Sequence, residues 1–515
     1  MKILLSGFFL LCTLVLFAQT PNDEAKYTKK FTYQTLSSYQ KQLFDDFIAE
    51  QMPKNSGLVL NENTSTRGIT RLACALLYRN NQGDIKKAIA IIKWIFTLQN
   101  LDEKSKDFAV WRGNGKPNQN YDQNMREFIG TDLISIYHKY KQKLPEELQK
   151  ELEVCLIRTV KGAVMRNVNP DYNNISIMSS FMMEYVGTAF NIPDYKRAGI
   201  EKAKAIYANF LKYNTLCEYN SPTYYGVDFV GLALWRELSF SPEMKDMSNK
   251  LEQELWLDVA TFYNANLQNI SGPYLRAYGI DMKKSHAIIG TWIAVALDNP
   301  KIAAIPGKDG THHEREFIVP IVEMGISMPL KAWQQFKKFD KPRFITRTTA
   351  NYYEGDRLKK VTANIQRDWM MGGLWGNRKV SHILKTGTMH WKSEKGDIGW
   401  LFVPGEGKTN VKVDETKMQI FLADEKATMF QIFVYEKNIT PEFFKENSWK
   451  FPQMTLQVKT ILKSKPEILS QEMMDSEGVG TKDFPYVINM VFEIPANWDK
   501  TIPLIEITPK KGKNE

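Results

Sequence analysis

A loop in the middle of the chain gathers side chains of the kinds that bind and transform substrates. The stretch CEYNSPTYYGVDFVGLALW begins at Cys217, and its second half has the apolar spacing of a helix. Its first half holds an acid, an amide and three tyrosines, namely Glu218, Tyr219, Asn220, Tyr224 and Tyr225. A helix cap needs only one polar residue, such as Ser221 or Thr223. Because loops on a rigid scaffold carry functional groups, we expect a functional site here.

Two further loops have the same character. DYNNISIM places Asn173 and Asn174 at the head of a helix, where one would cap the helix and the other could bond a carboxylate. SGPYLRAYGIDM supplies Arg276 with Tyr278 beside it. A tyrosine with its ordinary pKa near ~10 is a poor base at neutral pH and needs a nearby positive charge. Arg276 is the candidate for that charge.

The stretch WRGNGKPNQNYDQNMREF is a fourth dense loop. Trp111 could stack on a sugar face, and Arg112 could pair with a carboxylate. Asp122 and Asn124 precede a helix, which Asp122 could also cap.

The six histidines offer two candidates. His286 follows the Arg276 loop and could face the site, and His390 in KTGTMHWKS lies on an expected strand. His312 and His313, with two glutamates nearby, lack the spacing of metal ligands on one helical face. Neither a metal nor another cofactor is expected, because the chain has no phosphate-binding loop, dinucleotide fingerprint or zinc-protease motif.

The elements that must position these loops fall into two halves. From about 66 to 297 the chain reads as serial helical hairpins, which form either a solenoid or a toroid. After Pro300, alternating strands separated by turns predict an antiparallel β-sandwich. The expected fold is an incomplete α/α toroid over 19–300, a connection over 301–344 and a β-sandwich over 345–515.

The first residues and the composition suggest export. MKILLSGFFLLCTLVLFAQT has the form of a secretory signal over residues 1–18, so a periplasmic or secreted protein is expected. No later segment of the sequence is apolar enough to be a membrane span. Lys and Arg total 68 against 58 acidic residues, a net charge of +10. The expected partner is therefore an acidic polysaccharide or oligosaccharide and not a nucleic acid, unless the surface is simply basic throughout.

A helical half followed by an all-β half resembles the α/α-toroid polysaccharide lyases. These include the chondroitin and hyaluronan lyases, the heparinase II/III group and the oligoalginate lyases. The motifs DQNMREF, DYNNISIM, EYNSPTYYGVD and GPYLRAYGIDM are similar to those of exported bacterial and fungal proteins of this type.

This resemblance implies β-elimination at a uronic acid. In related toroid lyases an Asn neutralises the carboxylate, and a Tyr helped by Arg or His moves the proton from C5 to the leaving oxygen at C4. The catalytic candidates in this chain are Asn173, Asn174, Tyr224, Tyr225, Arg276 and His390. The substrate-binding candidates are Glu218, Asn220, Tyr278, Trp111, Arg112, Asp122, Asn124 and His286. The chain departs from the pattern because no histidine lies between Asn174 and Tyr225.

Two other functions fit the same residues. A glycoside hydrolase on an α/α scaffold would use paired carboxylates, which Glu218, Asp228, Asp122 and Asp281 could supply. A glycan-binding protein without catalysis would use the aromatic loops as its cleft.

Overall fold

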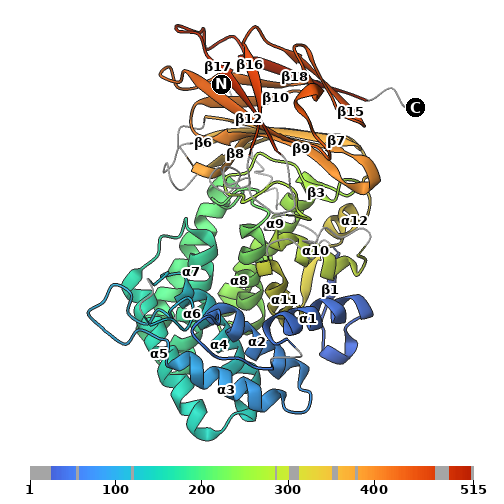
Figure 1. Cartoon of the computed structure of the whole chain (residues 1–515). Coiled ribbons are helices and arrows are strands. Elements are labelled where there is room, and N and C mark those ends of the chain that lie inside the picture. The colour runs from blue at the N-terminus through green and yellow to red at the C-terminus, as the bar shows by residue number, and fades with distance from the viewer. Residues whose placement is uncertain are drawn as a thin grey trace, which may run out of the picture.

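The computed structural model describes residues 25–53, 57–117, 121–284, 287–300, 312–350, 358–376, 381–469 and 487–511. An α domain is followed by a β domain that stacks on one end of it, which confirms the predicted order of the two halves (Figure 1). The expected signal over residues 1–18 lies outside the described residues.

The helical half is built from hairpins in which one helix is buried and the next is half exposed. Its long helices are α1 (Ser38–Gln51), α2 (Thr66–Arg79), α3 (Asp84–Phe96), α4 (Met125–Tyr140), α5 (Glu146–Arg166), α6 (Asn173–Ala189), α7 (Pro193–Tyr213), α8 (Tyr224–Leu238), α9 (Pro242–Phe262) and α10 (Ile288–Leu297). The sequence of α10, IIGTWIAVAL, has no charged residue and is almost wholly buried. In contrast, α7 buries only one stripe of residues.

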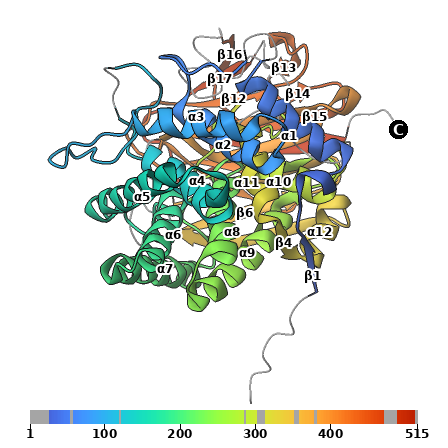
Figure 2. The same cartoon turned by 90° about the horizontal axis from the view of Figure 1, so that it is seen from below.

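The buried helices lie side by side. α2 contacts α4, α4 contacts α6, α6 contacts α8, and α8 contacts α10. Each of α3, α5, α7 and α9 packs against the helix that precedes it. Viewed from below, α5 and α7 lie at the periphery, and α4, α6 and α8 lie nearer the centre (Figure 2). The heads of the central helices therefore meet at one end, where the predicted loops are.

The segment 301–344, expected to be a connection, contributes elements of its own to the helical half. It contains α11 (Ile318–Met324), β4 (Ile326–Pro329) and α12 (Leu330–Lys337), and α11 contacts α2, α8 and α10. Strand β1 (Lys26–Lys29) pairs with β4 in antiparallel fashion. Apolar residues of α11 fill the space between central helices, which a mere linker would not do.

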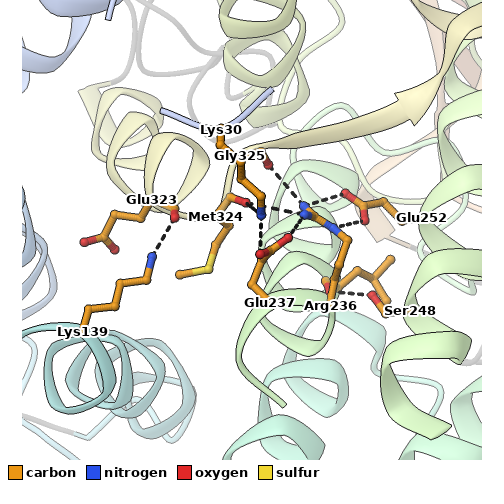
Figure 3. A network of polar contacts seen from close by, with 10 residues as sticks. Lys30, Lys139, Arg236, Glu237, Ser248, Glu252, Glu323, Met324 and Gly325 are labelled. Carbon is orange, nitrogen blue, oxygen red and sulfur yellow. Dashed lines mark hydrogen bonds and ion pairs between the residues drawn. The ribbon is translucent and has the colours of Figure 1, made fainter. Parts of the chain in front are cut away.

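A network of charges joins these elements at the far end of α8 (Figure 3). Arg236 donates to the Glu252 carboxylate on α9, with Nε 2.8 Å from Oε2. It also donates to the carbonyl of Gly325, at the end of α11, at 3.2 Å. Lys30 pairs with Glu237 on α8. Because a buried ion pair needs such additional hydrogen bonds to offset desolvation, this network is best explained as structural.

The described strands of the β half form two antiparallel sheets. The strands are β5 (Arg343–Ala350), β6 (Leu358–Ile365), β7 (Trp369–Trp375), β8 (Ser381–Lys392), β9 (Ile398–Gly405), β10 (Thr409–Val413), β11 (Met418–Leu422), β12 (Met429–Tyr435), β13 (Phe444–Lys445), β14 (Ser448–Lys450), β15 (Met454–Lys459), β16 (Ser464–Ile468), β17 (Ile488–Glu493) and β18 (Ile505–Lys511). One sheet has the order β16-β17-β12-β9-β8-β7-β6-β5, and the other β10-β11-β18-β15-β14-β13.

The larger sheet is buried on both faces. On β9, Leu401 and Val403 join the apolar core shared with the smaller sheet, whereas Trp400 and Phe402 join the core of the helical half. This alternation follows the period of two in a strand. The molecule therefore has three layers, with the larger sheet between the helices and the smaller sheet. Among the described residues, no helix is long and apolar enough to cross a membrane.

Candidate functional site

A pocket of about 420 Å³ lies at the heads of α4, α6, α8 and α10. It is lined by Arg67, Asp122, Asn124, Phe128, Tyr172, Asn174, Thr223, Tyr224, Val227, Arg276, Tyr278, Ile288 and Phe317. Four loops singled out in the sequence meet here, although they are separated by up to about 150 residues. The heads of helices carry a partial positive charge, so this end of the bundle also favours negative groups.

The centre of the pocket wall is a trio of polar side chains. Arg276 Nη2 donates to the Tyr224 hydroxyl at 2.8 Å, and its guanidinium carbon lies 3.8 Å from the centre of the Tyr224 ring. The Tyr224 and Tyr278 hydroxyls are 2.6 Å apart. Arg276 is buried, Tyr224 is half-buried and Tyr278 is 39% exposed. The trio therefore connects a buried cation to solvent through two phenols.

Glu218 lies behind this trio and not on the pocket wall. Its Oε1 accepts from Arg276 Nη1, and its Oε2 accepts from the backbone N–H of Asn174 at 3.0 Å. The second bond satisfies a free N–H in the first turn of α6, which an N-cap side chain would otherwise satisfy. The prediction that Glu218 binds substrate directly is wrong, because its carboxylate is fully buried and already engaged.

Burial dominates the proton affinity of Tyr224. It raises the pKa of Tyr224 well above the ordinary value, although Arg276 lowers it and Tyr278 raises it further. Arg276 was expected to favour the Tyr224 phenolate, and it does lower the pKa of Tyr224, but burial raises that pKa by more. Arg276 opposes the rise, but Tyr224 at rest is a neutral phenol and a proton donor.

Asn174 has an amide oxygen, Oδ1, without a hydrogen-bond partner among the described residues. Its side chain lines the pocket and is almost fully buried. Asn173 is different, because its Oδ1 accepts from the backbone N–H of Cys217 at 2.7 Å and ties two loops together. Of the two asparagines, only Asn174 is placed to contact a ligand.

Asn124 is held in position on the opposite wall. It accepts from Arg166 Nη2 at 2.7 Å and donates to the Tyr172 hydroxyl at 3.1 Å. Tyr172 in turn lies with its ring 5.6 Å from the Arg276 guanidinium carbon. Asp122, also on this wall, is exposed and accepts from the Asn124 backbone N–H at 3.0 Å.

Sequence reasoning missed part of the lining. The Arg67 guanidinium carbon lies 4.1 Å from the centre of the Phe128 ring and 5.3 Å from that of Phe317, and Arg67 pairs with Glu316. These residues come from α2, α4 and the segment before α11, and each looks like an ordinary helical residue in the sequence. Tyr172 could have been found, because it directly precedes Asn173 and Asn174 in the same loop.

Several predicted site residues are structural instead. Tyr225 is fully buried, and its hydroxyl lies 3.2 Å from Thr215 Oγ1 and 3.4 Å from Asp258 Oδ2, away from the pocket. Trp111 is also fully buried in the helical core and cannot stack on a sugar.

Two more predicted residues have local structural contacts. Arg112 donates to the backbone carbonyl of Lys116 at 3.1 Å and does not line the pocket. Asn220 donates to the carbonyls of Ser271 and Pro273 at 2.7 and 3.0 Å, and so joins the Glu218 loop to the Arg276 loop.

His390 is not on the pocket wall either. It is fully buried in β8, with Nε2 2.8 Å from the carbonyl oxygen of Ile280. Burial lowers its pKa to about 4, so it is neutral at physiological pH. His286 lies outside the described residues.

The carboxylates proposed for hydrolysis are not arranged as a pair in the pocket. Asp228 is fully buried, and neither of its oxygens has a hydrogen-bond partner among the described residues. Burial raises the pKa of Asp228 well above its ordinary value, and the Glu218 charge raises it further. Asp281 is buried outside the pocket. Asp122 is thus the one carboxylate that reaches the pocket among the described residues. No group of three or more metal-ligating side chains occurs in the described part of the chain.

A family model matches residues 38–326, which is more than half of the chain, and its description is Domain of unknown function (DUF8769). The chain belongs to this family. The match covers the pocket-forming helices and ends at the start of β4. It does not include the β half.

Solved structures similar to the chain include two carbohydrate enzymes. The endoglucanase CelQ from Clostridium thermocellum, complexed with cellotriose, is 8% identical over 88% of this chain and 70% of that chain, with a TM-score of 0.27. The GH127 β-arabinofuranosidase BT3674 is 7% identical over 94% and 96%, with a TM-score of 0.29. No inference about this chain follows from likeness at these scores. No curated protein matches the sequence.

Proposed function

We propose that this chain is a carbohydrate-active enzyme, and specifically a lyase that cleaves a uronic-acid glycan by β-elimination in the pocket at the helix heads. The observation that carries the proposal is the Tyr224 hydroxyl, which meets Arg276 at 2.8 Å and Tyr278 at 2.6 Å on the pocket wall. We also infer that the row of central helices is an incomplete α/α toroid, which their successive contacts support. We further propose that the protein is exported to the periplasm or the medium.

The proposed reaction moves one proton and breaks one bond. The Tyr224 phenol first loses its proton through Tyr278 to solvent, and Arg276 stabilises the phenolate. The phenolate then takes the C5 proton of the uronate, the C4–O bond breaks as the C4=C5 double bond forms, and the same phenol returns its proton to the leaving oxygen. The phenolate is regenerated, so one tyrosine acts as base and then as acid.

The rest of the lining supports an acidic sugar. Asn174 lines the pocket, where its amide Nδ2 would donate to the uronate carboxylate and make the C5 proton more acidic, and its Oδ1, unpaired among the described residues, would accept from a sugar hydroxyl. Arg67 adds a cation on the neighbouring wall, and Phe128, Tyr172 and Phe317 add aromatic faces. The heads of four helices favour the same charge.

Glycoside hydrolysis is the alternative that one observation favours. Burial raises the pKa of Glu218, as a general acid requires, and Asp122 could act as base across the pocket. Hydrolysis by this pair would require Glu218 to break its ion pair with Arg276 and reach the substrate. A glycan-binding role without catalysis is the remaining alternative.

The test is the product formed from a panel of uronic-acid polysaccharides. A lyase yields an unsaturated sugar that absorbs ultraviolet light, whereas a hydrolase yields a reducing end without that absorbance. Tyr224→Phe should lower turnover by about 100- to 10,000-fold, the usual loss for a general acid or base. Tyr225→Phe is the matched control, because it removes a hydroxyl one residue along that points into the core.

Equal activity in wild type and Tyr224→Phe would refute the role of Tyr224. A reducing product without unsaturation, lost in Glu218→Gln, would favour the hydrolase. Tight binding of an intact glycan with no product would favour a binding protein.

A further inference from the structure

The loop that carries Arg276 is held by the β half. The Tyr274 N–H donates to the Lys385 carbonyl at 3.1 Å, and the Lys385 N–H donates back to the Tyr274 carbonyl at 3.0 Å. The Ala277 N–H donates to the Ile383 carbonyl at 2.7 Å. Tyr274 and Ala277, the loop residues that make these bonds, lie on either side of Arg276 in the sequence. The loop therefore docks on β8 through an isolated antiparallel bridge at Tyr274 and one further backbone hydrogen bond at Ala277.

Strand β8 is irregular at the place where the loop docks. Its pairing with β9 shifts register between Ser381 and Lys385, and again between Lys385 and Gly387. Such bulges leave backbone groups outside the ladder. Pro404, which lies opposite Lys385 on β9, has no N–H to donate. The Lys385 carbonyl accepts from the Tyr274 N–H of the site loop.

Glycines allow the loop and the sheet to approach closely. A Cβ atom on Gly372 of β7 would lie 1.8 Å from the carbonyl oxygen of Gly272. A Cβ atom on Gly272 would lie 2.3 Å from Oγ1 of Thr388, which is the β8 neighbour of Gly372 in the sheet. Any larger side chain at Gly372 must displace the loop, because the obstructing atom is backbone.

His390 secures the far end of the same loop. The Ile280 carbonyl can only accept, so the ring nitrogen 2.8 Å away, Nε2, carries the proton. Nδ1 has no hydrogen-bond partner among the described residues, which fits a neutral ring with a single tautomer. His390 is therefore a fixed hydrogen-bond donor to the carbonyl of Ile280, which lies four residues beyond Arg276.

We propose that strand β8 sets the position of Arg276, so that the β half is a working part of the pocket and His390 is a positioning residue for it. This goes beyond the family match, which ends at residue 326 and leaves out the β half. The activity readouts below depend on the proposed function, whereas the exchange readout does not.

The first experiment is hydrogen–deuterium exchange of the full chain, read by mass spectrometry on peptides that cover residues 271–282. His390→Leu removes the donor, and we expect protection of this segment to fall by about tenfold, the size of one lost hydrogen bond. His390→Gln places an amide N–H where Nε2 lies, and His390→Asn is too short to do so. Gln should therefore keep the protection and Asn should lose it.

Unchanged exchange in His390→Leu, or equal loss in the Gln and Leu variants, would overturn the positioning role. This result is independent of any substrate. A chain that exchanges as expected but shows no lyase activity would refute the proposed function alone.

The second experiment compares two alanines in the same sheet. Gly372→Ala drives a methyl group into the loop backbone, whereas Gly387→Ala directs its methyl toward the Val411 side chain on the other face, with contacts of 3.0 Å. We expect kcat to fall at least about tenfold in Gly372→Ala and to stay within about twofold in Gly387→Ala. The rising limb of the activity profile should also move to higher pH in Gly372→Ala, because displaced Arg276 no longer favours the Tyr224 phenolate.

A Gly372→Ala chain with full activity and an unmoved pH profile would refute the proposal. If Gly372→Ala does not fold, the His390 series decides by the same pH shift.

Discussion

Replacing Arg276 by methionine should destabilise the chain in a pH-dependent way. The change leaves the Glu218 carboxylate fully buried, with the Asn174 N–H as its one remaining donor among the described residues. Removing one partner of a buried ion pair costs about 3–5 kcal/mol of unfolding free energy. The carboxyl can escape part of that cost by taking up a proton.

The sign follows from the pKa of Glu218. Burial already raises it, and Arg276 is the largest influence that lowers it. Without Arg276 the folded pKa rises further, so the folded variant binds a proton at higher pH than the unfolded chain does. Stability is then retained at low pH and lost as pH rises through the new folded pKa. The gap between wild type and Arg276→Met should therefore widen from ~pH 5 to ~pH 8.

The assay is urea unfolding followed by tryptophan fluorescence, with Glu218→Gln as the second mutation of a double-mutant cycle. In the Arg276→Met background, Glu218→Gln should recover stability, because it removes the stranded charge and the pH dependence with it. A double variant that loses the sum of the two single losses would refute the ion-pair account. So would a loss in Arg276→Met that is the same at both pH values.

Three other predictions test the placement of single residues. Trp111→Ala should lower the unfolding free energy by about 3–5 kcal/mol as a core truncation and leave KM unchanged at a temperature where it is folded; a raised KM with normal stability would return Trp111 to the binding site. Because of His390, the unfolding free energy should fall by up to about 3 kcal/mol as pH falls from ~6.5 to ~4, since only the unfolded chain takes up the proton in that window. His390→Gln should make the unfolding free energy less dependent on pH in this range, as measured by urea unfolding. Turnover should rise about tenfold per pH unit through the neutral range, because the raised pKa of Tyr224 keeps the phenolate scarce; a flat profile would contradict the base role.

The chemistry of the loops could be predicted from sequence, but the direction of each side chain could not. Tyr224 and Tyr225 are adjacent, and about 100° of helical turn sends one to the pocket and the other to the core. An amphipathic helix would have revealed which face is buried. Helix α8 is buried nearly all round, so its sequence has no such stripe.

Long-range packing decided the remaining differences. The polar loop around Trp111 suggested that its ring could stack on a sugar, but the ring is fully buried in the core of the helical half. Arg67 was missed because its partners Phe128 and Phe317 lie far along the chain. The two-half order was predictable because the switch from helical to alternating periodicity is a local property.

The pairing of β1 with β4 has a consequence for the order in which the chain can fold during synthesis. Lys26 is made about 300 residues before its partner Pro329. At ribosomal rates of about 5–20 residues per second, the first strand waits roughly 15–60 s for the segment that completes it. Until then the nascent chain lacks β4, so this pairing cannot form while the helices between the two strands are being made. The N-terminal segment is therefore among the last parts of the helical half to be secured.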